Sequence, residues 1–190
     1  MFITITGGAS SGKSRLGEDY ALRLGGPLLY IATMEPFGEE GKSRVARHRT
    51  LRQGKGFETL EIYRNLGEAL DEPSFQNTTT VLLECMLNLL ANETFSPANP
   101  GGDPVSYIKA DVLALRNAVP NLIVITGEIF SDGEDYPPET ARYIRDLGKV
   151  NRFLAAQSDL VVKAVAGIPL MLKGNLSKFS KQSAQPPNST

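Results

Sequence analysis

The chain has 190 residues, enough for one domain whose core needs no disulfide or structural metal. Its 20 basic and 21 acidic side chains nearly cancel, so no cationic field favours nucleic acid, and a small-molecule substrate is the better expectation. The single cysteine, Cys85, excludes an internal disulfide and a multi-cysteine metal site. Its apolar sequence neighbours predict a small buried side chain.

The sequence shows no sign of targeting to a membrane or for export. The first residues run directly into a strand pattern, without the charged and apolar regions of a secretory signal. No apolar run approaches the roughly 20 residues needed to cross a bilayer, so we expect a cytoplasmic protein. Residues 175–190 are rich in Ser, Lys, Gln and Pro, which predicts a mobile tail after a catalytic domain over residues 1–174.

The first predicted strand, residues 2–6, leads through a glycine-rich segment into a helix. That segment has the P-loop pattern G-x-x-x-x-G-K-S, and its residues are Gly7, Gly8, Ala9, Ser10, Ser11, Gly12, Lys13 and Ser14. Its backbone N–H groups are expected to surround the phosphates of a nucleotide. Lys13 reaches the β and γ oxygens, and the Ser14 hydroxyl binds Mg²⁺. Position between a strand and a helix favours this reading over a structural turn.

A second predicted strand, residues 28–33, precedes a polar and strongly basic helix over residues 39–53. This helix carries the only histidine, His48, with Arg44 and Arg52 four residues away on either side and therefore on the same face. Clustered arginines disfavour a protonated imidazole and bind phosphates, so His48 is a candidate neutral nucleophile. The alternative is a solvated basic face that happens to contain one histidine.

Strands are then predicted over residues 57–63 and 78–84, and the second of these ends in Glu84. A carboxylate at the carboxyl end of a buried strand could hold Mg²⁺ or one of its waters. The alternative is an ordinary carboxylate at a strand end.

The remaining elements continue the alternation. A helix is predicted after residue 86, a loop over 96–104, a helix over 105–119 and a strand over 122–126. A helix beginning near Pro137 and Pro138, a strand over 160–165 and an edge strand over 168–172 complete the chain. The order predicts an α/β fold, a three-layer P-loop NTPase (RecA-like) domain with a mostly parallel central sheet. Ligands of such sheets gather at the carboxyl ends of the strands.

Taken together, the motifs resemble the bifunctional adenosylcobinamide kinase/adenosylcobinamide-phosphate guanylyltransferase family of cobalamin biosynthesis. The segments that carry the resemblance are TGGASSGKSR (6–15), LYIAT (29–33), RVARHRTLR (44–52), TLE (59–61), LLEC (82–85), GKVN (148–151) and AGIPLMLK (166–173). The P-loop alone is shared by many NTPases, whereas this ordered set is specific to few families.

The resemblance implies two activities. ATP or GTP phosphorylates adenosylcobinamide, and GMP then passes from GTP through a guanylylated histidine to adenosylcobinamide phosphate, giving adenosylcobinamide-GDP. It places that histidine at His48 and implies a homotrimer. Besides the P-loop, the nucleotide contacts that it implies are Ala32, Thr33, Arg49, Thr50, Leu51, Arg52, Glu61 and Glu84.

The chain departs from the family pattern over residues 127–138. Gly127 replaces a usual asparagine, and Asp132, Glu134 and Asp135 add negative charge that would repel a phosphate unless a cation intervenes. Either the loop varies while both reactions persist, or one activity is altered or lost. Two other functions stay open: a single-function small-molecule P-loop kinase, and a nucleotide-dependent binding or switch protein that turns over no metabolite.

Overall fold

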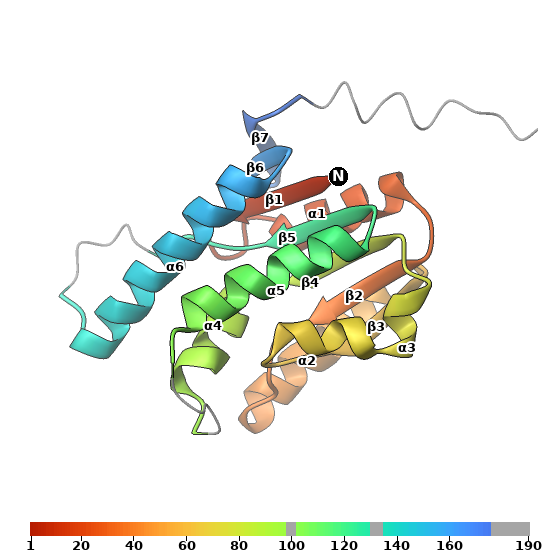
Figure 1. Cartoon of the computed structure of the whole chain (residues 1–190). Helices are drawn as coiled ribbons and strands as arrows, with labels where there is room; N and C mark the ends of the chain where they lie inside the picture. The colour runs from red at the N-terminus through yellow and green to blue at the C-terminus, as the bar shows by residue number, and fades with distance from the viewer. Residues whose placement is uncertain (98–101, 130–134, 176–190) are drawn as a thin grey trace, which may run out of the picture.

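A seven-stranded sheet forms the centre of the protein in the computed structural model, which describes residues 1–97, 102–129 and 135–175 (Figure 1). The side chains of Glu40, Arg44, His48, Leu51 and Arg52 lie outside the described part. The strands are β1 (Phe2–Gly7), β2 (Leu28–Ala32), β3 (Phe57–Glu61), β4 (Thr80–Glu84), β5 (Asn121–Ile125), β6 (Leu160–Val165) and β7 (Ile168–Lys173). Their order across the sheet is β3-β2-β4-β5-β1-β6-β7.

Strands β1 to β6 run parallel, and β7 pairs antiparallel with β6 at one edge. The β6–β7 turn is made by Ala166 and Gly167, both with positive φ (49° and 81°), as a tight hairpin turn requires. The predicted mostly parallel sheet and its edge strand are therefore confirmed. Since β1 to β6 point the same way, the segments that follow them share one edge of the sheet.

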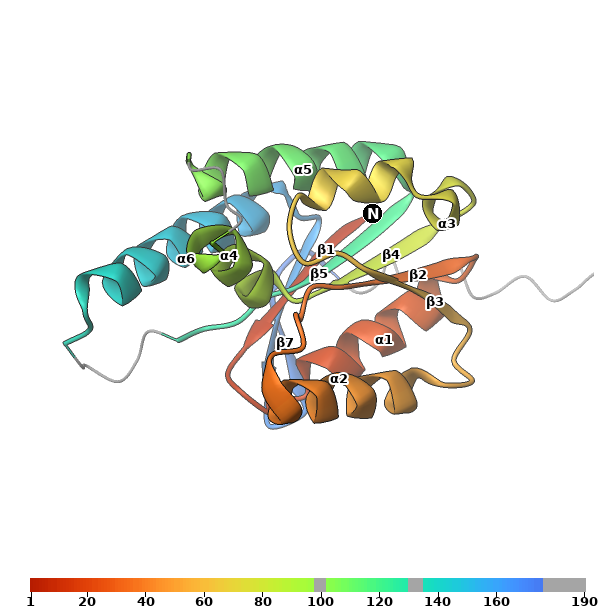
Figure 2. The same ribbon diagram turned by 90° about the horizontal axis from the view of Figure 1, so that it is seen from below.

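Helices connect the strands and cover both faces of the sheet. They are α1 (Lys13–Leu24), α2 (Gly38–Arg52), the 3₁₀ helix η1 (Leu66–Asp71), α3 (Pro73–Gln76), α4 (Met86–Phe95), α5 (Pro104–Ala118) and α6 (Pro138–Gln157). Figure 2 shows α1 and α2 on one side of the sheet and α5 on the other. The three layers predicted from the alternating pattern are thus present.

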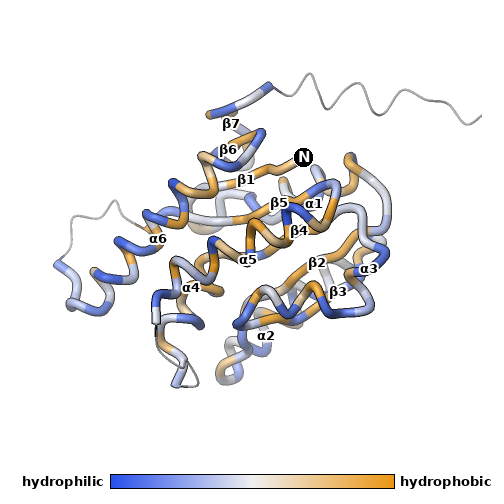
Figure 3. Tube along the Cα trace, in the orientation of Figure 1, coloured by the Kyte–Doolittle hydropathy of each residue, from blue (hydrophilic) through white to orange (hydrophobic). Residues whose placement is uncertain are grey.

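Two apolar clusters fill the spaces between these layers. One joins Ile3, Ile5 and Tyr30 of the sheet to Tyr20 and Ala21 of α1. The larger cluster lies on the other face, where η1, α4, α5 and α6 pack against alternate strand residues. Figure 3 shows the hydrophobic strands β1, β2 and β5 at the centre of both. Burial on both faces explains why these strands have near-continuous apolar sequences.

The sequence patterns missed some local structure. Neither η1 nor the short α3 was predicted, and β3 ends at Glu61 rather than at Tyr63. The predicted mobile tail lies, from residue 176 on, outside the described residues. Among the helices that the structure describes, none has the length and apolar character needed to span a membrane.

Candidate active site

The predicted P-loop forms a tight turn between β1 and α1. Gly12 has φ 92°, a left-handed conformation that favours glycine, and α1 begins at the next residue. A Cβ built on Gly7 would lie 2.5 Å from the Ala164 carbonyl oxygen of β6, so only glycine fits there. The Gly167 N–H donates to the Ser11 carbonyl oxygen at 3.0 Å, which ties the loop to the β6–β7 turn. The loop therefore opens onto the amino end of α1, where N–H groups favour an anion.

Lys13 lies inside this turn. Its Nζ donates to the Gly8 carbonyl oxygen at 2.5 Å, so the ammonium group folds back over the loop. Burial lowers the pKa of Lys13, while the nearby Cys85, Glu84 and Glu128 act in the opposite direction. A half-buried cation beside the P-loop suits a polyphosphate, whose charge would stabilise the ammonium form.

Glu84 and Ser14 meet beside the P-loop. The Ser14 hydroxyl donates to Glu84 Oε1, and the Tyr30 hydroxyl donates to Glu84 Oε2 at 2.7 Å. The carboxylate thus extends from β4 toward α1 and is fixed by two hydroxyls. A serine hydroxyl and a carboxylate next to a phosphate cradle form the oxygen donor set that Mg²⁺ uses in P-loop enzymes. Tyr30, which sequence reasoning missed, anchors this pair.

Three predicted nucleotide-binding residues occupy one row across the sheet. Ala32 is the register partner of Glu84 on one side and of Glu61 on the other. Thr33 comes next but is fully buried, and its Oγ1 donates to the Cys85 carbonyl and accepts from the Cys85 N–H, both at 2.8 Å. Thr33 therefore joins the ends of β2 and β4, and its contact with a nucleotide stays a prediction.

Helix α2 lies on the same side of the sheet as α1 (Figure 2), and its backbone places position 48 four residues before the helix ends. Arg49 forms an ion pair with Glu61, whose other oxygen accepts a hydrogen bond from Tyr63 at 2.8 Å. Burial, followed by the contact with Glu61, raises the pKa of Tyr63 to about 12. The Thr50 hydroxyl bonds to the Ala46 carbonyl within the helix. The side chains of His48, Leu51 and Arg52 lie outside the description.

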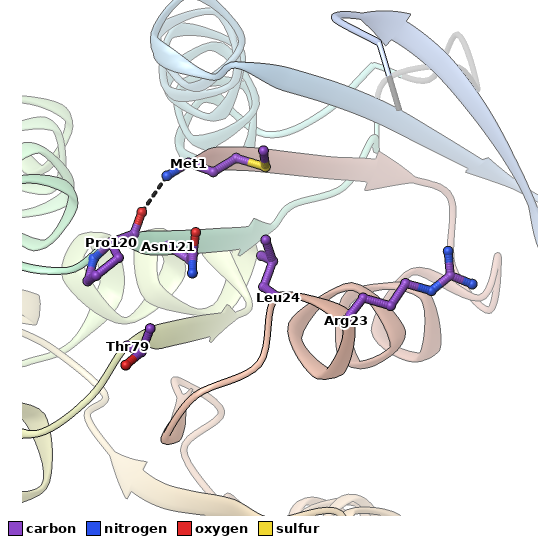
Figure 4. A pocket seen from close by; sticks show the side chains of 6 residues that line it. All are labelled: Met1, Arg23, Leu24, Thr79, Pro120 and Asn121. Carbon is purple, nitrogen blue, oxygen red and sulfur yellow. Dashed lines mark hydrogen bonds between the residues drawn. The ribbon is translucent and has the colours of Figure 1, made fainter. Parts of the chain in front are cut away.

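A separate pocket lies at the amino ends of the strands, away from the P-loop (Figure 4). Its lining residues are Met1, Arg23, Leu24, Thr79, Pro120 and Asn121. In Figure 4 the guanidinium of Arg23 points away from Met1 and Asn121. The pocket therefore lies at the opposite edge of the sheet from the carboxyl ends of the strands, where ligands of α/β sheets bind.

Comparison with known proteins decides between the families that share a P-loop. The sequence model of the cobinamide kinase / cobinamide phosphate guanyltransferase family matches residues 3–172. The chain belongs to this family. It is 32% identical over 189 residues to the bifunctional adenosylcobalamin biosynthesis protein CobU of Salmonella typhimurium, and the match covers 91% of this chain and 100% of the relative.

Two further relatives carry corresponding names. The protein CobU of Escherichia coli is 32% identical over 190 residues, covering 91% of this chain and all of the relative. The bifunctional protein CobP of Pseudomonas aeruginosa is 28% identical over 172 residues, covering 90% and 96% of the two chains. The family predicted from the motifs is thereby confirmed.

The departure of this chain from the family pattern has a local structural reason at Gly127. A Cβ there would lie 3.0 Å from Leu87 Cδ1 and 3.3 Å from the Gly7 carbonyl oxygen of the P-loop. Asn151 of α6 donates to the Gly127 carbonyl at 3.1 Å and accepts from the Thr126 hydroxyl at 2.6 Å. The backbone at the end of β5 is therefore held by α6 without an amide at position 127. Of the added acidic residues, Asp132 and Glu134 lie outside the described residues.

Glu128, the next residue, forms an ion pair with Lys163 of β6 at 2.8 Å. Both side chains are about one third exposed, and the Thr6 hydroxyl lies 3.5 Å from the other oxygen of Glu128. The pair stands on the carboxyl edge close enough for Glu128 to influence Lys13. Sequence reasoning did not select Lys163, because its only signal is a charge in an otherwise apolar strand.

Proposed function

We propose that this chain phosphorylates adenosylcobinamide with ATP or GTP and then transfers GMP from GTP to adenosylcobinamide phosphate, giving adenosylcobinamide-GDP. The observation that carries the proposal is the P-loop of a chain of this family, in which Lys13 contacts the Gly8 carbonyl oxygen and Ser14 is bonded to Glu84. A basic helix on the same side of the sheet adds the histidine that the second reaction needs.

In the first reaction, the P-loop N–H groups and Lys13 hold the β- and γ-phosphates. The hydroxyl of adenosylcobinamide attacks the γ-phosphorus, an O–P bond forms, and the bond to the β-phosphate oxygen breaks. The proton of the hydroxyl passes to solvent, and the nucleoside diphosphate leaves. Ser14 and Glu84 would hold Mg²⁺, which offsets charge on the phosphate oxygens when bound. The pair fits this ion because both groups offer oxygen atoms on the same side of the loop.

In the second reaction, an imidazole nitrogen of His48 attacks the α-phosphorus of GTP. An N–P bond forms, and the bond from the α-phosphorus to the leaving pyrophosphate breaks. A phosphate oxygen of adenosylcobinamide phosphate then attacks the same phosphorus, and the N–P bond breaks to release the free imidazole. Covalent catalysis divides one difficult displacement into two easier ones. Arg49, held by Glu61, lies one residue from His48 and offers a cation for the phosphates.

The test follows two labels. GTP labelled on the α-phosphate should give an acid-labile protein adduct in the wild type and in Ser43→Ala, an exposed α2 control, but none in His48→Ala. An adduct that persists in His48→Ala would exclude His48 as the nucleophile. Label on the γ-phosphate should pass to adenosylcobinamide. Transfer that survives complete chelation with EDTA would exclude the role of Mg²⁺.

The same assays separate the other candidate functions. A plain P-loop kinase gives γ-phosphate transfer without any adduct. A nucleotide-dependent switch binds the triphosphate but transfers neither label when cobinamide is supplied. The P-loop alone is compatible with all three functions, so formation of the protein adduct is the deciding measurement.

We further propose that the enzyme acts in the cytoplasm as a homotrimer. The family resemblance supports the trimer, and the edge strand β7 exposes Ile168, Leu170 and Leu172, apolar side chains of the kind that partner subunits cover. Sedimentation velocity on the full chain should give the mass of three subunits, and a monomer at micromolar concentration would exclude this assembly.

A further inference from the structure

Asn92 of α4 connects two segments that are far apart in the sequence. Its Nδ2 donates to the Thr33 carbonyl oxygen and to the Tyr63 carbonyl oxygen, at 2.9 Å each. An amide nitrogen has two hydrogens, so one side chain satisfies both acceptors. Thr33 follows β2 and Tyr63 follows β3, which means that Asn92 ties together the segments after two neighbouring strands.

Two further contacts join the same segments. Arg64 forms an ion pair with Glu35 at 3.0 Å, and the Asn65 N–H donates to Glu93 Oε1 at 2.6 Å. Glu93 is buried, and the Arg64 and Glu35 side chains are about 30% and 25% exposed. We call Asn92, Glu93 and the Arg64–Glu35 pair the root clamp. It links α4 to residues 63–65 and those residues to the segment after β2.

The root clamp holds the start of the segment that contains α2. The chain leaves the sheet after Thr33, forms α2, and re-enters the sheet as β3. Figure 2 shows α2 and α4 on opposite sides of the sheet, so α4 holds the residues before α2 from the other side, at the carboxyl edge. The residues after α2 enter β3 at its amino end, away from the clamp. Helix α2 itself is polar, and Arg49–Glu61 links it to the sheet through side chains that are 57% and 31% exposed. A solvated pair of this kind contributes little to the free energy of unfolding.

We propose that Asn92 is a positioning residue for guanylyl transfer, which sets where α2 presents position 48 relative to a triphosphate in the P-loop. The inference rests on the proposed function, since it takes His48 as the nucleophile. Phosphoryl transfer depends on the P-loop, Ser14 and Glu84. The Thr33 N–H donates to the Glu84 carbonyl oxygen at 2.9 Å, but the Glu84 carboxylate is fixed by the Ser14 and Tyr30 hydroxyls and not by the clamp. Loss of Asn92 therefore slows the two reactions unequally.

The alternative is that Asn92 only stabilises the fold by satisfying two carbonyl groups. A general loss of stability would lower both reactions in proportion to the folded fraction. A positioning role lowers the rate constant of adduct formation at saturating GTP and leaves GTP affinity nearly unchanged, because the P-loop still binds the phosphates. Small displacements of a nucleophile reduce its rate steeply, by up to roughly 100-fold for about 1 Å.

The experiment uses Asn92→Asp, which keeps the shape but replaces two donor hydrogens with an acceptor. The matched control is Asn117→Asp, an exposed asparagine of α5. For each protein, single-turnover adduct formation from α-labelled GTP, GTP affinity and γ-phosphate transfer are measured. In Asn92→Asp we expect the ratio of adduct rate to phosphoryl-transfer rate to fall about tenfold or more. An unchanged ratio would overturn the inference.

A second variant covers the case in which Asn92→Asp does not fold. Arg64→Gln removes only the partly exposed pair with Glu35, so the chain should fold, and the same ratio should fall by a smaller factor of about three. A ratio equal to that of the wild type in this variant counts against the root clamp. Failure of the proposed function is recognised separately, because the wild-type chain then forms no adduct at all.

Discussion

The P-loop and helix α2 are both expected to act on one triphosphate, yet they are attached to the fold in different ways. The P-loop is exposed at Gly8, Ala9, Ser10 and Gly12 but firmly anchored: a Cβ on Gly7 would touch β6, Ser11 is bonded to the β6–β7 turn, and Ser14 is bonded to Glu84. We call the P-loop together with Glu84 and Cys85 the anchored region. Helix α2 is a polar helix that the Arg49–Glu61 pair links to the sheet near its carboxyl end. The phosphate-binding loop is thus anchored to the sheet, whereas the helix with the proposed nucleophile depends on the segment before it and on contacts near its carboxyl end.

This difference assigns different consequences to changes in the two regions. A change within the anchored region alters the site that both reactions use, and both activities fall together. A change at the attachment of α2 separates the two activities, because only guanylyl transfer needs position 48. The comparison can therefore be tested by measuring both activities in each variant.

The largest effect is expected from Lys13→Met, which removes the half-buried cation but keeps most of the side-chain length. Both phosphoryl transfer and adduct formation should fall by about 100-fold or more, as for the loss of one strong charge-stabilising donor. Nucleotide binding to the wild type should also weaken as the pH rises, because burial lowers the pKa of Lys13 and the cation is lost earlier than in an exposed lysine.

The control for this change is Lys109→Met, on α5, where the ammonium lies 5.7 Å from the ring centre of Phe153. Both activities should survive in the control. If Lys13→Met reduced only one of the two reactions, the P-loop would not be a shared phosphate site. The expected parallel loss would then be wrong.

The features of the anchored region were predictable because their sequence signals are local. The glycines, Lys13 and Ser14 have fixed spacing between a strand and a helix, and the structure confirms that context. Glu84 ends a buried strand, which was enough to place it at the carboxyl edge of the sheet. The alternation of strands and helices likewise predicted the layers and the parallel sheet, since each element carries its own period.

A smaller and selective effect is expected from Glu61→Gln, which removes the charge that holds Arg49. Because the pair is largely solvated, the free energy of unfolding should change by at most about 1 kcal/mol. Adduct formation should fall by about tenfold, since Arg49 loses its fixed position next to His48. Phosphoryl transfer should fall by much less. Chemical denaturation and the two label-transfer assays measure these quantities.

Two companions make this result interpretable. Glu58→Gln changes an exposed carboxylate on the same strand and should alter neither reaction. Tyr63→Phe removes only the 2.8 Å hydrogen bond to Glu61, so it should shift the activity ratio in the same direction but less. Equal loss of both reactions in Glu61→Gln would show that Glu61 serves the shared phosphate site rather than α2.

The attachment of α2 could not have been predicted from the sequence. The partners of Asn92 are two main-chain carbonyls, which have no residue-type signature, and their proximity depends on the order β3-β2-β4. The pairing of Arg49 with Glu61 likewise depends on how α2 lies beside β3, which the sequence pattern does not specify. The 3₁₀ helix η1 was missed because six residues are too few to establish a helical period. Local motifs therefore identify the chemistry, while contacts between distant segments determine its geometry.

The smallest effect concerns Cys85, which follows Glu84 in the anchored region. Part of the residue is accessible to solvent, but burial of the thiol group raises its pKa to about 11. At pH 8 about one thiol in a thousand is then ionised, against roughly a quarter for an exposed cysteine.

A second thiol introduced on α2 by Ser43→Cys, at an exposed position, provides the comparison within one chain. Iodoacetamide should modify position 43 at least about 100-fold faster than Cys85, and the Cys85 rate should keep rising with pH up to about 11. Peptide mass spectrometry after timed quenching measures both rates. Equal rates at the two positions would mean that the thiol at the end of β4 is as accessible to the reagent as the one on α2. The contrast between an anchored phosphate site and an exposed helix would then no longer hold.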